Sequence, residues 1–172
     1  MRADNRAKFP GWHNAPVPSW GDRDAPLLIL GMAPGLRGAN RTGRPFTGDY
    51  AGKLLYGTLL KFGLATGEYH EDPNDGMQLR GCRIANAVRC VPPANLPEPA
   101  ETRTCNQFLR AELAAMPNLK AVLALGVLAH AAALRACAAC ACAGPRLCRR
   151  CVNHRCRHRR CSLESPTPAI AG

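Results

Sequence analysis

The chain has 172 residues, enough for one domain with a single buried core, and carries a formal net charge of +11 with a pI of about 9.6. This charge indicates a polyanionic partner, for which nucleic acid is the first candidate, although an ordinary basic protein would show the same balance. The sequence has no apolar stretch long enough to cross a bilayer and does not open on a secretory signal, so we expect a cytoplasmic protein with no membrane partner.

The first predicted elements are an extended segment and a buried strand. Residues 1–25 are mostly polar and contain three prolines, which favours an extended conformation. Leu27–Leu30 is fully apolar and lies between Pro26 and Gly31, which is typical of a buried parallel strand.

A glycine-rich loop follows this strand and is the most informative part of the chain. Residues 31–48 contain five glycines, the arginines Arg37, Arg41 and Arg44, and a single aromatic residue, Phe46. Glycine lets bare backbone approach a ligand, and guanidinium groups bind phosphate. The loop therefore predicts a site that stacks a flat ring beside a phosphate backbone, with Arg41 and Arg44 as the phosphate contacts.

Helices and strands alternate after the loop. Asp49 can cap a helix that ends at Gly63 and whose apolar residues follow helical spacing. Residues 67–76 predict a polar loop, and residues 83–88 predict a second strand. The apolar residues of the helix are Leu54, Leu55, Leu59 and Phe62.

The same alternation continues through residue 134. Residues 98–116 predict a helix, residues 119–125 a third strand and residues 127–134 a further helix. The apolar face of the first of these helices is Phe108, Leu109 and Leu113. This order predicts an α/β fold, a three-layer α/β/α arrangement around a central parallel sheet, with ligands beyond the carboxyl ends of the strands.

The composition changes sharply near Ala136, so we expect residues 1–135 to form the folded domain and residues 136–172 a Cys/Arg-rich tail. The tail holds seven of the ten cysteines, seven arginines and one glutamate, with no lysine or aromatic residue. It shows no periodicity with enough apolar mass to join a core.

Three interpretations of the tail compete: a zinc site of knuckle-like spacing, a disulfide framework, and a disordered or out-of-frame translation of GC-rich DNA. A knuckle needs glycines that are absent between its cysteines, and an intracellular protein disfavours disulfides. We favour the out-of-frame interpretation and keep zinc as the alternative. The zinc ligands would be Cys148, Cys151, Cys156 and Cys161, with His154 and His158 as spare ligands.

Several collinear segments carry a family resemblance that runs from about Phe9 to Leu134. GANRTGRPFTGD at residues 38–49 resembles the first motif of the type-B (family 5) uracil-DNA glycosylases, the iron–sulfur branch of the uracil-DNA glycosylase superfamily. WHNAPVPSWGD at residues 12–22 and RIANAVRCVPPANLPEPAE at residues 83–101 are similar to the family's N-terminal and middle segments. The resemblance implies a base-excision repair enzyme that hydrolyses the N-glycosidic bond of uracil in DNA, acting as a monomer.

The resemblance also implies roles for individual residues. Phe46 would stack on the base, and Asn86, which has both a donor and an acceptor, would pair with the uracil edge. Asp49 would orient or activate water, Ala33 stands where other branches have a polar catalytic residue, and the backbone up to Gly35 would hold phosphate or polarise the base. The structural alternatives are a core aromatic for Phe46, a strand-end cap for Asn86 and a helix cap for Asp49.

Parts of the family pattern are not found in this sequence. The resemblance implies a four-iron, four-sulfur cluster held by four cysteines, of which Cys90 and Cys105 fit two, while residues 1–81 contain no cysteine. Cys82 is interpreted as a small buried apolar residue. No segment matches the family's histidine-bearing second catalytic motif, and His130 is expected to be structural. We therefore expect the last strand and helix to be missing and the activity of this chain to be impaired.

Two other hypotheses stay open. The first is a non-catalytic nucleic-acid-binding protein with a zinc-binding basic tail, which predicts stoichiometric zinc and a steep salt dependence of binding. The second is a misfolded product, whose exposed sheet edge would favour aggregation.

Overall fold

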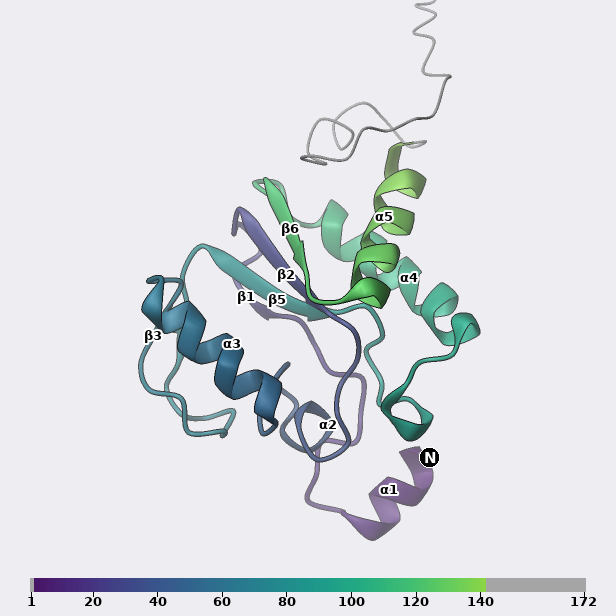
Figure 1. The fold of residues 1–172 in the computed structure, drawn as a ribbon. Coiled ribbons are helices and arrows are strands. Elements are labelled where there is room, and N and C mark those ends of the chain that lie inside the picture. Colours follow the sequence, from purple (N-terminus) through teal and green to yellow (C-terminus); the bar gives the residue numbers. More distant parts are fainter. Residues whose placement is uncertain (1, 142–172) are drawn as a thin grey trace, which may run out of the picture.

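The computed structural model describes residues 2–141, and its central sheet has four strands in the order β1-β5-β2-β6 (Figure 1). Strand β2 lies between β5 and β6 and is parallel to both, with Ile29 opposite Ile84 on one side and Leu123 on the other. Strand β1 is antiparallel to β5. The strands of this sheet are β1 (Trp20–Gly21), β2 (Leu27–Gly31), β5 (Cys82–Asn86) and β6 (Ala121–Ala124).

Helices cover both faces of the sheet, which gives the predicted three-layer α/β/α fold with a mostly parallel sheet. Figure 1 shows α3 on one side and α4 with α5 on the other. A short antiparallel pair, β3 (Ala65–Thr66) and β4 (Gln78–Leu79), follows α3. The helices are α1 (Arg2–Lys8), α2 (Ala39–Thr42), α3 (Tyr50–Lys61), the 3-10 turn η1 (Pro93–Asn95), α4 (Pro99–Ala114) and α5 (Val127–Ala141).

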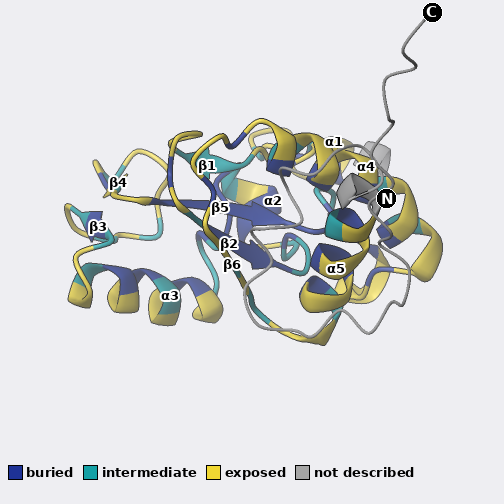
Figure 2. Cartoon of the chain, turned by 90° about the horizontal axis from the view of Figure 1, so that it is seen from above, coloured by how far each residue is buried: buried dark blue, intermediate teal, exposed yellow. Residues whose placement is uncertain are grey.

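The core has two apolar clusters, one on each face of the sheet. Successive side chains of a strand point to opposite faces, so Leu28 and Leu30 join the cluster under α4 and α5 while Ile29 joins the cluster under α3. Figure 2 shows the central strands as a buried band between helices with exposed outer surfaces. Among the described residues, no helix is long and apolar enough to cross a membrane.

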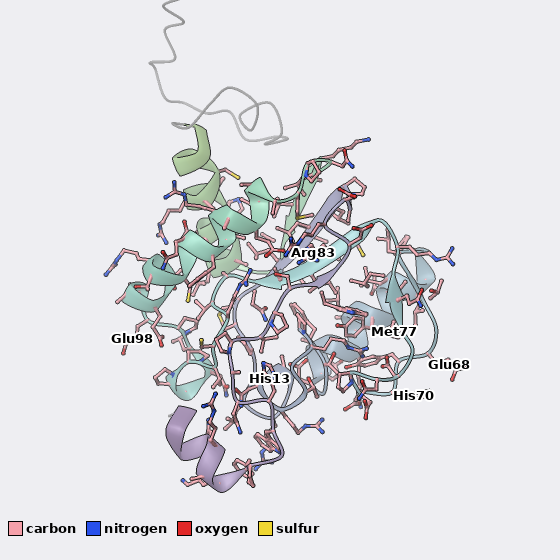
Figure 3. All side chains as sticks on the ribbon, turned by 180° about the vertical axis from the view of Figure 1, so that it is seen from behind. His13, Glu68, His70, Met77, Arg83 and Glu98 are labelled. Carbon is pink, nitrogen blue, oxygen red and sulfur yellow. The ribbon has the colours of Figure 1, made fainter. Side chains whose placement is uncertain are left out.

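A buried ion pair fastens the sheet to α4. Arg83 on β5, which is labelled in Figure 3, donates from Nε to Glu112 at 2.5 Å. Arg89 donates to the other carboxylate oxygen of Glu112 at 2.6 Å. Burial raises the pKa of Glu112, but the hydrogen bond and charge of Arg83 outweigh it, so the pKa lies below its ordinary value. The pair is therefore ionised at neutral pH.

Several local predictions were wrong. Residues 1–25 were expected to be extended, yet they begin with the helix α1, and only the two residues of β1 form a strand. The glycine-rich loop contains the short helix α2, which begins at Ala39. In this loop the backbone N–H groups of Thr42 and Gly43 find acceptors four residues back, so one helical turn satisfies them.

The predicted apolar faces of two helices were only partly right. In α3 the buried residues include Tyr56 and Leu59, whereas Leu54 and Phe62 are 68% and 70% exposed. Tyr56 can be buried because its hydroxyl finds an acceptor, the carbonyl oxygen of Pro45. In α4 the expected Leu109 and Leu113 are buried, but Phe108 is half-exposed.

Helix α5 extends beyond the predicted end at residue 134. Ala136 is fully buried and Cys137 packs against the same cluster, so the expected boundary at 135/136 falls inside this helix. The division into a domain and a tail stays a prediction. The proposed zinc ligands, from Cys148 to Cys161, lie outside the described residues.

Candidate functional site

A cavity of about 610 Å³ opens beyond the carboxyl ends of β2 and β5, where a parallel sheet is expected to bind its ligand. The glycine-rich loop, the first turns of α3 and the end of β5 form its walls. All five residues predicted for base binding or catalysis line it, namely Ala33, Gly35, Phe46, Asp49 and Asn86. The sequence therefore predicted residues that are brought together from separate elements.

The ring of Phe46 and the amide of Asn86 meet over Gly31. A Cβ atom on Gly31 would lie 2.7 Å from Cε2 of Phe46 and 2.5 Å from Oδ1 of Asn86, so only glycine leaves room for both side chains. Phe46 also contacts the apolar cluster under α3 as a half-buried residue. The two interpretations of Phe46 are compatible, because one part of the ring packs on the core while the residue lines the cavity.

Asn86 is the last residue of β5 and is 7% exposed. The strand end is held by backbone bonds, since the next residue, Ala87, donates its N–H to the carbonyl oxygen of Gly31 at 2.9 Å. Within residues 2–141 the Asn86 side chain makes no hydrogen bond, so it does not act as a strand-end cap. Its donor and acceptor are left for a ligand in the cavity.

Asp49 caps α3 as the sequence allowed, and its second oxygen stays open for the other role. Its Oδ1 accepts a hydrogen bond from the N–H of Gly52 at 2.9 Å and so caps α3. Its Oδ2 lies over the loop, 2.6 Å from where a Cβ atom of Gly38 would stand and 3.5 Å from that of Gly35. One carboxylate oxygen is used by the helix, and the other lies against the loop that walls the cavity.

Arg44 is not available as a phosphate contact, which corrects the prediction. It is 4% exposed, and its two terminal nitrogens bind the two carboxylate oxygens of Asp75, each at 2.7 Å. Its Nε donates to Oγ1 of Thr47 at 2.7 Å. Burial lowers the pKa of Arg44, but the bond to Asp75 and the nearby tyrosines raise it overall, so the charge is permanent. A buried guanidinium with a carboxylate partner is part of the scaffold.

Arg41 keeps an exposed position at the rim of a second groove of about 500 Å³. Its Nε donates to the carbonyl oxygen of Arg37 at 2.9 Å, and its guanidinium group folds against Gly48. Trp12 and His13 line the same groove. The predicted phosphate role of Arg41 therefore stays open.

Sequence reasoning missed several residues around the cavity. Asn95, in the turn η1 after β5, lines the cavity and accepts a hydrogen bond from the N–H of Leu36 at 3.3 Å. Leu123 and Leu125 line the wall at the β6 edge. Tyr69, from the loop predicted as polar, binds the backbone on both sides of Thr47. A lone aromatic residue in an otherwise polar loop was the signal that could have identified Tyr69.

The described residues do not fit a four-iron cluster on their own. Cys90 and Cys105 are half-buried, and no group of three or more His, Cys, Asp or Glu side chains is arranged to hold a metal ion in residues 2–141. Cys82 is fully buried as expected, and burial raises the pKa of its thiol. His130 is exposed on α5 and does not line the cavity.

The fold and the cavity define an α/β protein with a ligand-sized cavity at the carboxyl end of its sheet. The family model of the uracil DNA glycosylase superfamily matches residues 18–171. The chain belongs to this superfamily. The matched range runs past residue 135, where the motif resemblance ended.

Individual relatives agree with the predicted branch. The chain is 45% identical over 141 residues to a type-5 uracil-DNA glycosylase of Mycobacterium bovis, covering 81% of this chain and 52% of the relative. It is 44% identical over 119 residues to the type-5 enzyme of Thermus thermophilus, covering 69% of this chain and 54% of the relative. A type-4 enzyme of Thermotoga maritima is 33% identical over 110 residues, covering 63% of this chain and 49% of the relative. The chain spans about half the length of these curated relatives, and the resemblance to the type-5 branch is confirmed.

Proposed function

We propose that this chain acts on uracil in DNA as a glycosylase of base-excision repair. The observation that carries the proposal is the cavity in which Phe46, Asn86 and Asp49 meet, in a chain whose similar relatives are named uracil-DNA glycosylases. A pocket with one aromatic wall and one unused amide suits a flipped pyrimidine. The non-catalytic alternative is not favoured, because it gives no reason for this combination.

In the proposed mechanism, the flipped uracil stacks on Phe46 and pairs with Asn86. The amide NH₂ donates to a uracil carbonyl, and Oδ1 accepts from the ring N–H beside it. Cytosine carries an amino group on the edge that Asn86 would read, and thymine carries a ring methyl group that the cavity walls would have to accommodate. Asn86 would therefore select against cytosine, and the walls against thymine.

Asp49 would orient the attacking water through Oδ2 while Oδ1 keeps its bond to Gly52. The water oxygen bonds to the sugar C1′, and the electron pair of the broken C1′–N bond leaves with the uracil anion. The water proton departs by way of the carboxylate, and uracil is protonated by solvent. The backbone N–H groups of Met32, Ala33 and Gly35 would stabilise the charge of the departing base.

The direct test is release of uracil from an oligonucleotide with one deoxyuridine, with the protein in excess. The Asn86→Asp variant should lose about a hundredfold in rate, because a carboxylate repels the uracil carbonyl. Asn118→Asp, at an exposed position, makes the same change in charge and should leave the rate unaltered. No release by the parent, with equal binding of uracil- and thymine-containing strands, would contradict the proposal. The parent rate also tests the expected impairment.

An iron–sulfur cluster is a separate proposal that rests on the family resemblance. Cys90 and Cys105 would supply two thiolates, and further ligands would have to come from outside the described residues. Iron and sulfide analysis of protein purified without oxygen should give about four of each per chain. Substoichiometric iron together with one zinc per chain would replace this proposal with the zinc interpretation of the tail. No step of the mechanism depends on either metal.

The remaining expectations follow from the proposed substrate. The partner would be DNA that contains uracil, the chain would act as a monomer, and the site of action would be the cytoplasm. Light scattering during chromatography, with and without an oligonucleotide, checks the monomer directly.

A further inference from the structure

We infer that the loop between β3 and β4 sets the position of the base-stacking ring, and that Tyr69 is the positioning residue that connects this loop to Phe46. The inference rests on the proposed function for its consequence in catalysis. The contacts that support it belong to a loop to which sequence reasoning gave no role.

The backbone of Phe46 needs support from its surroundings. Its φ of +56° lies in the left-handed region, which a side chain with a Cβ atom rarely adopts outside a well-defined environment. The next glycine, Gly48, also has a positive φ of +87°. Phe46 is the residue whose ring lines the cavity, so the strained conformation coincides with the aromatic wall of the site.

Two tyrosine hydroxyls hold this stretch of backbone. Tyr69 Oη donates to the carbonyl oxygen of Phe46 at 3.2 Å and accepts from the N–H of Gly48 at 3.2 Å. Tyr56 Oη donates to the carbonyl oxygen of Pro45 at 2.5 Å. The peptide groups on each side of Phe46 are therefore fixed by side chains from outside the glycine-rich loop, Tyr56 from α3 and Tyr69 from the β3–β4 loop.

The close approach of α3 to this stretch requires a glycine. A Cβ atom on Gly52 would collide with the carbonyl oxygen of Phe46 and would lie 2.7 Å from Tyr69 Oη. The N–H of the same glycine caps the helix through Asp49. Gly52 therefore leaves room for the hydrogen bond between Tyr69 and Phe46 and also donates the N–H that Asp49 binds as helix cap.

Tyr69 is itself held by a buried cluster. Its ring centroid lies 4.6 Å from that of Tyr56, and Cζ of Arg44 lies 5.9 Å from its ring. Asp75, whose side chain is fully buried, binds Arg44 and also accepts from the backbone N–H of His70 at 3.2 Å. Figure 3 shows the loop that carries His70, with Met77 at its inner end. The loop is folded around one carboxylate, and that carboxylate fixes the residue next to Tyr69.

The Tyr69 phenol keeps the proton that it donates to the carbonyl oxygen of Phe46 at neutral pH. Burial raises the pKa of Tyr69, so the phenol stays a donor at neutral pH. Lys53 and Glu71 form an exposed ion pair at 2.8 Å above the loop, and Glu68 with His70 forms another at 3.2 Å. These outer pairs are solvated and contribute little to holding the loop.

The test uses Tyr69→Phe, which removes only the bridging hydroxyl, with Tyr50→Phe as a matched control at an 84% exposed position. The chain has four phenylalanines, so protein labelled with 4-fluorophenylalanine gives four ¹⁹F resonances, and Phe46→Leu assigns the one of interest. In Tyr69→Phe we expect the Phe46 resonance to shift or broaden while the other three stay unchanged. An unchanged Phe46 resonance would overturn the inference.

A second readout connects the ring to uracil release. Loss of positioning should raise the half-saturating DNA concentration, with about a tenfold fall in kcat/KM and little change in the rate at saturation. Tyr50→Phe should match the parent in both quantities. If the rate at saturation fell by the same factor as kcat/KM, the result would contradict a positioning role for Tyr69. If Tyr69→Phe moves the Phe46 resonance but the parent releases no uracil, the positioning stands and the proposed function fails.

Discussion

Each face of the central sheet has an apolar cluster and a buried ion pair, but only one of the two polar networks reaches the cavity. On the face covered by α4 and α5, Leu28 and Leu30 pack against Leu109, Leu113 and a series of alanines. The ion pair between Arg83 and Glu112 joins the sheet to α4 on this face but does not line the cavity. On the face covered by α3, the apolar cluster continues into a network of an ion pair and two tyrosine hydroxyls that ends at the cavity. The difference indicates that the α4/α5 face contributes to stability, whereas the α3 face contributes both to stability and to the position of the site.

This comparison predicts that substitutions separate into three groups. Changes on the α4/α5 face should cost stability and leave the cavity intact. Changes at the cavity wall should cost base recognition and leave stability intact. Changes at the ion pair beneath the tyrosines should cost both, because the network belongs to the core and to the site.

The largest effect is expected for Asp75→Asn. This change leaves the buried Arg44 without its carboxylate, and breaking a buried pair in this way costs about 3–5 kcal/mol of unfolding free energy. Uracil release should fall as well. Urea unfolding measures the loss, with Asp24→Asn at an exposed position as the control. A loss below about 1 kcal/mol would show that the pair is unimportant for the fold.

Leu113→Ala should be nearly as destabilising, by about 2–5 kcal/mol, since it opens a cavity in the cluster under α4. The rate of uracil release below the melting temperature should stay within a factor of two of the parent. Leu134→Ala, at a 47% exposed position on α5, removes the same atoms and should cost much less. Equal losses in the two variants would contradict the burial on this face.

Gly31→Ala should lower uracil release by about a hundredfold with little loss of stability. The added methyl group would displace the Phe46 ring and the Asn86 amide, which meet at that position. Gly57→Ala is the matched control on α3, where a Cβ atom meets nothing within 4 Å, and it should stabilise the helix by about 0.5–1 kcal/mol. A normal rate of uracil release by Gly31→Ala would contradict the claim that Phe46 and Asn86 need the space above Gly31.

Acid should weaken the ion pair between Arg44 and Asp75 on the α3 face. The hydrogen bond from Arg44 lowers the pKa of Asp75 from 3.8 to about 2. Because the folded pKa is the lower one, this stabilisation is complete above pH 3.8 and is lost as the pH falls to about 2, by up to about 2 kcal/mol. The difference in unfolding free energy between the parent and Asp75→Asn should therefore shrink by up to about 2 kcal/mol over that interval. A constant difference between them would contradict the assignment.

The smallest effect is expected for Arg41→Ala. Its exposed guanidinium would contact one phosphate, so its loss should weaken binding to all DNA sequences alike and reduce the slope of log K against log salt by about one. Arg103→Ala on α4 is the control for the change in net charge. Identical slopes in the two variants would leave the phosphate role of Arg41 unsupported.

Local patterns in the sequence were sufficient to predict the parts of the fold that depend on them. The apolar run of β2, the cap at Asp49 and the position of the cavity at the strand ends followed from hydrophobicity, helix-end chemistry and the geometry of parallel sheets. The meeting of Asn86 with the glycine-rich loop was predictable for the same reason, since neighbouring parallel strands end at one edge.

Contacts between distant segments could not be predicted in this way. Arg44 looked like a phosphate contact because its partner, Asp75, stands 31 residues later in a loop without periodicity. Leu54 looked like a core residue by helical spacing, but the buried face of α3 is turned toward Tyr56, whose hydroxyl has an acceptor in the loop. The short elements α1, β1 and α2 carry too few residues for a periodic pattern.

The most direct test of the central claim follows the side-chain amide of Asn86 by NMR while free uracil is added, with free thymine as the comparison. We expect uracil to shift the two amide proton resonances of Asn86 and the fluorine resonance of a labelled Phe46, and thymine to shift them much less. If uracil at saturating concentration leaves both residues unchanged, the cavity between β2, β5 and α3 is not the uracil site.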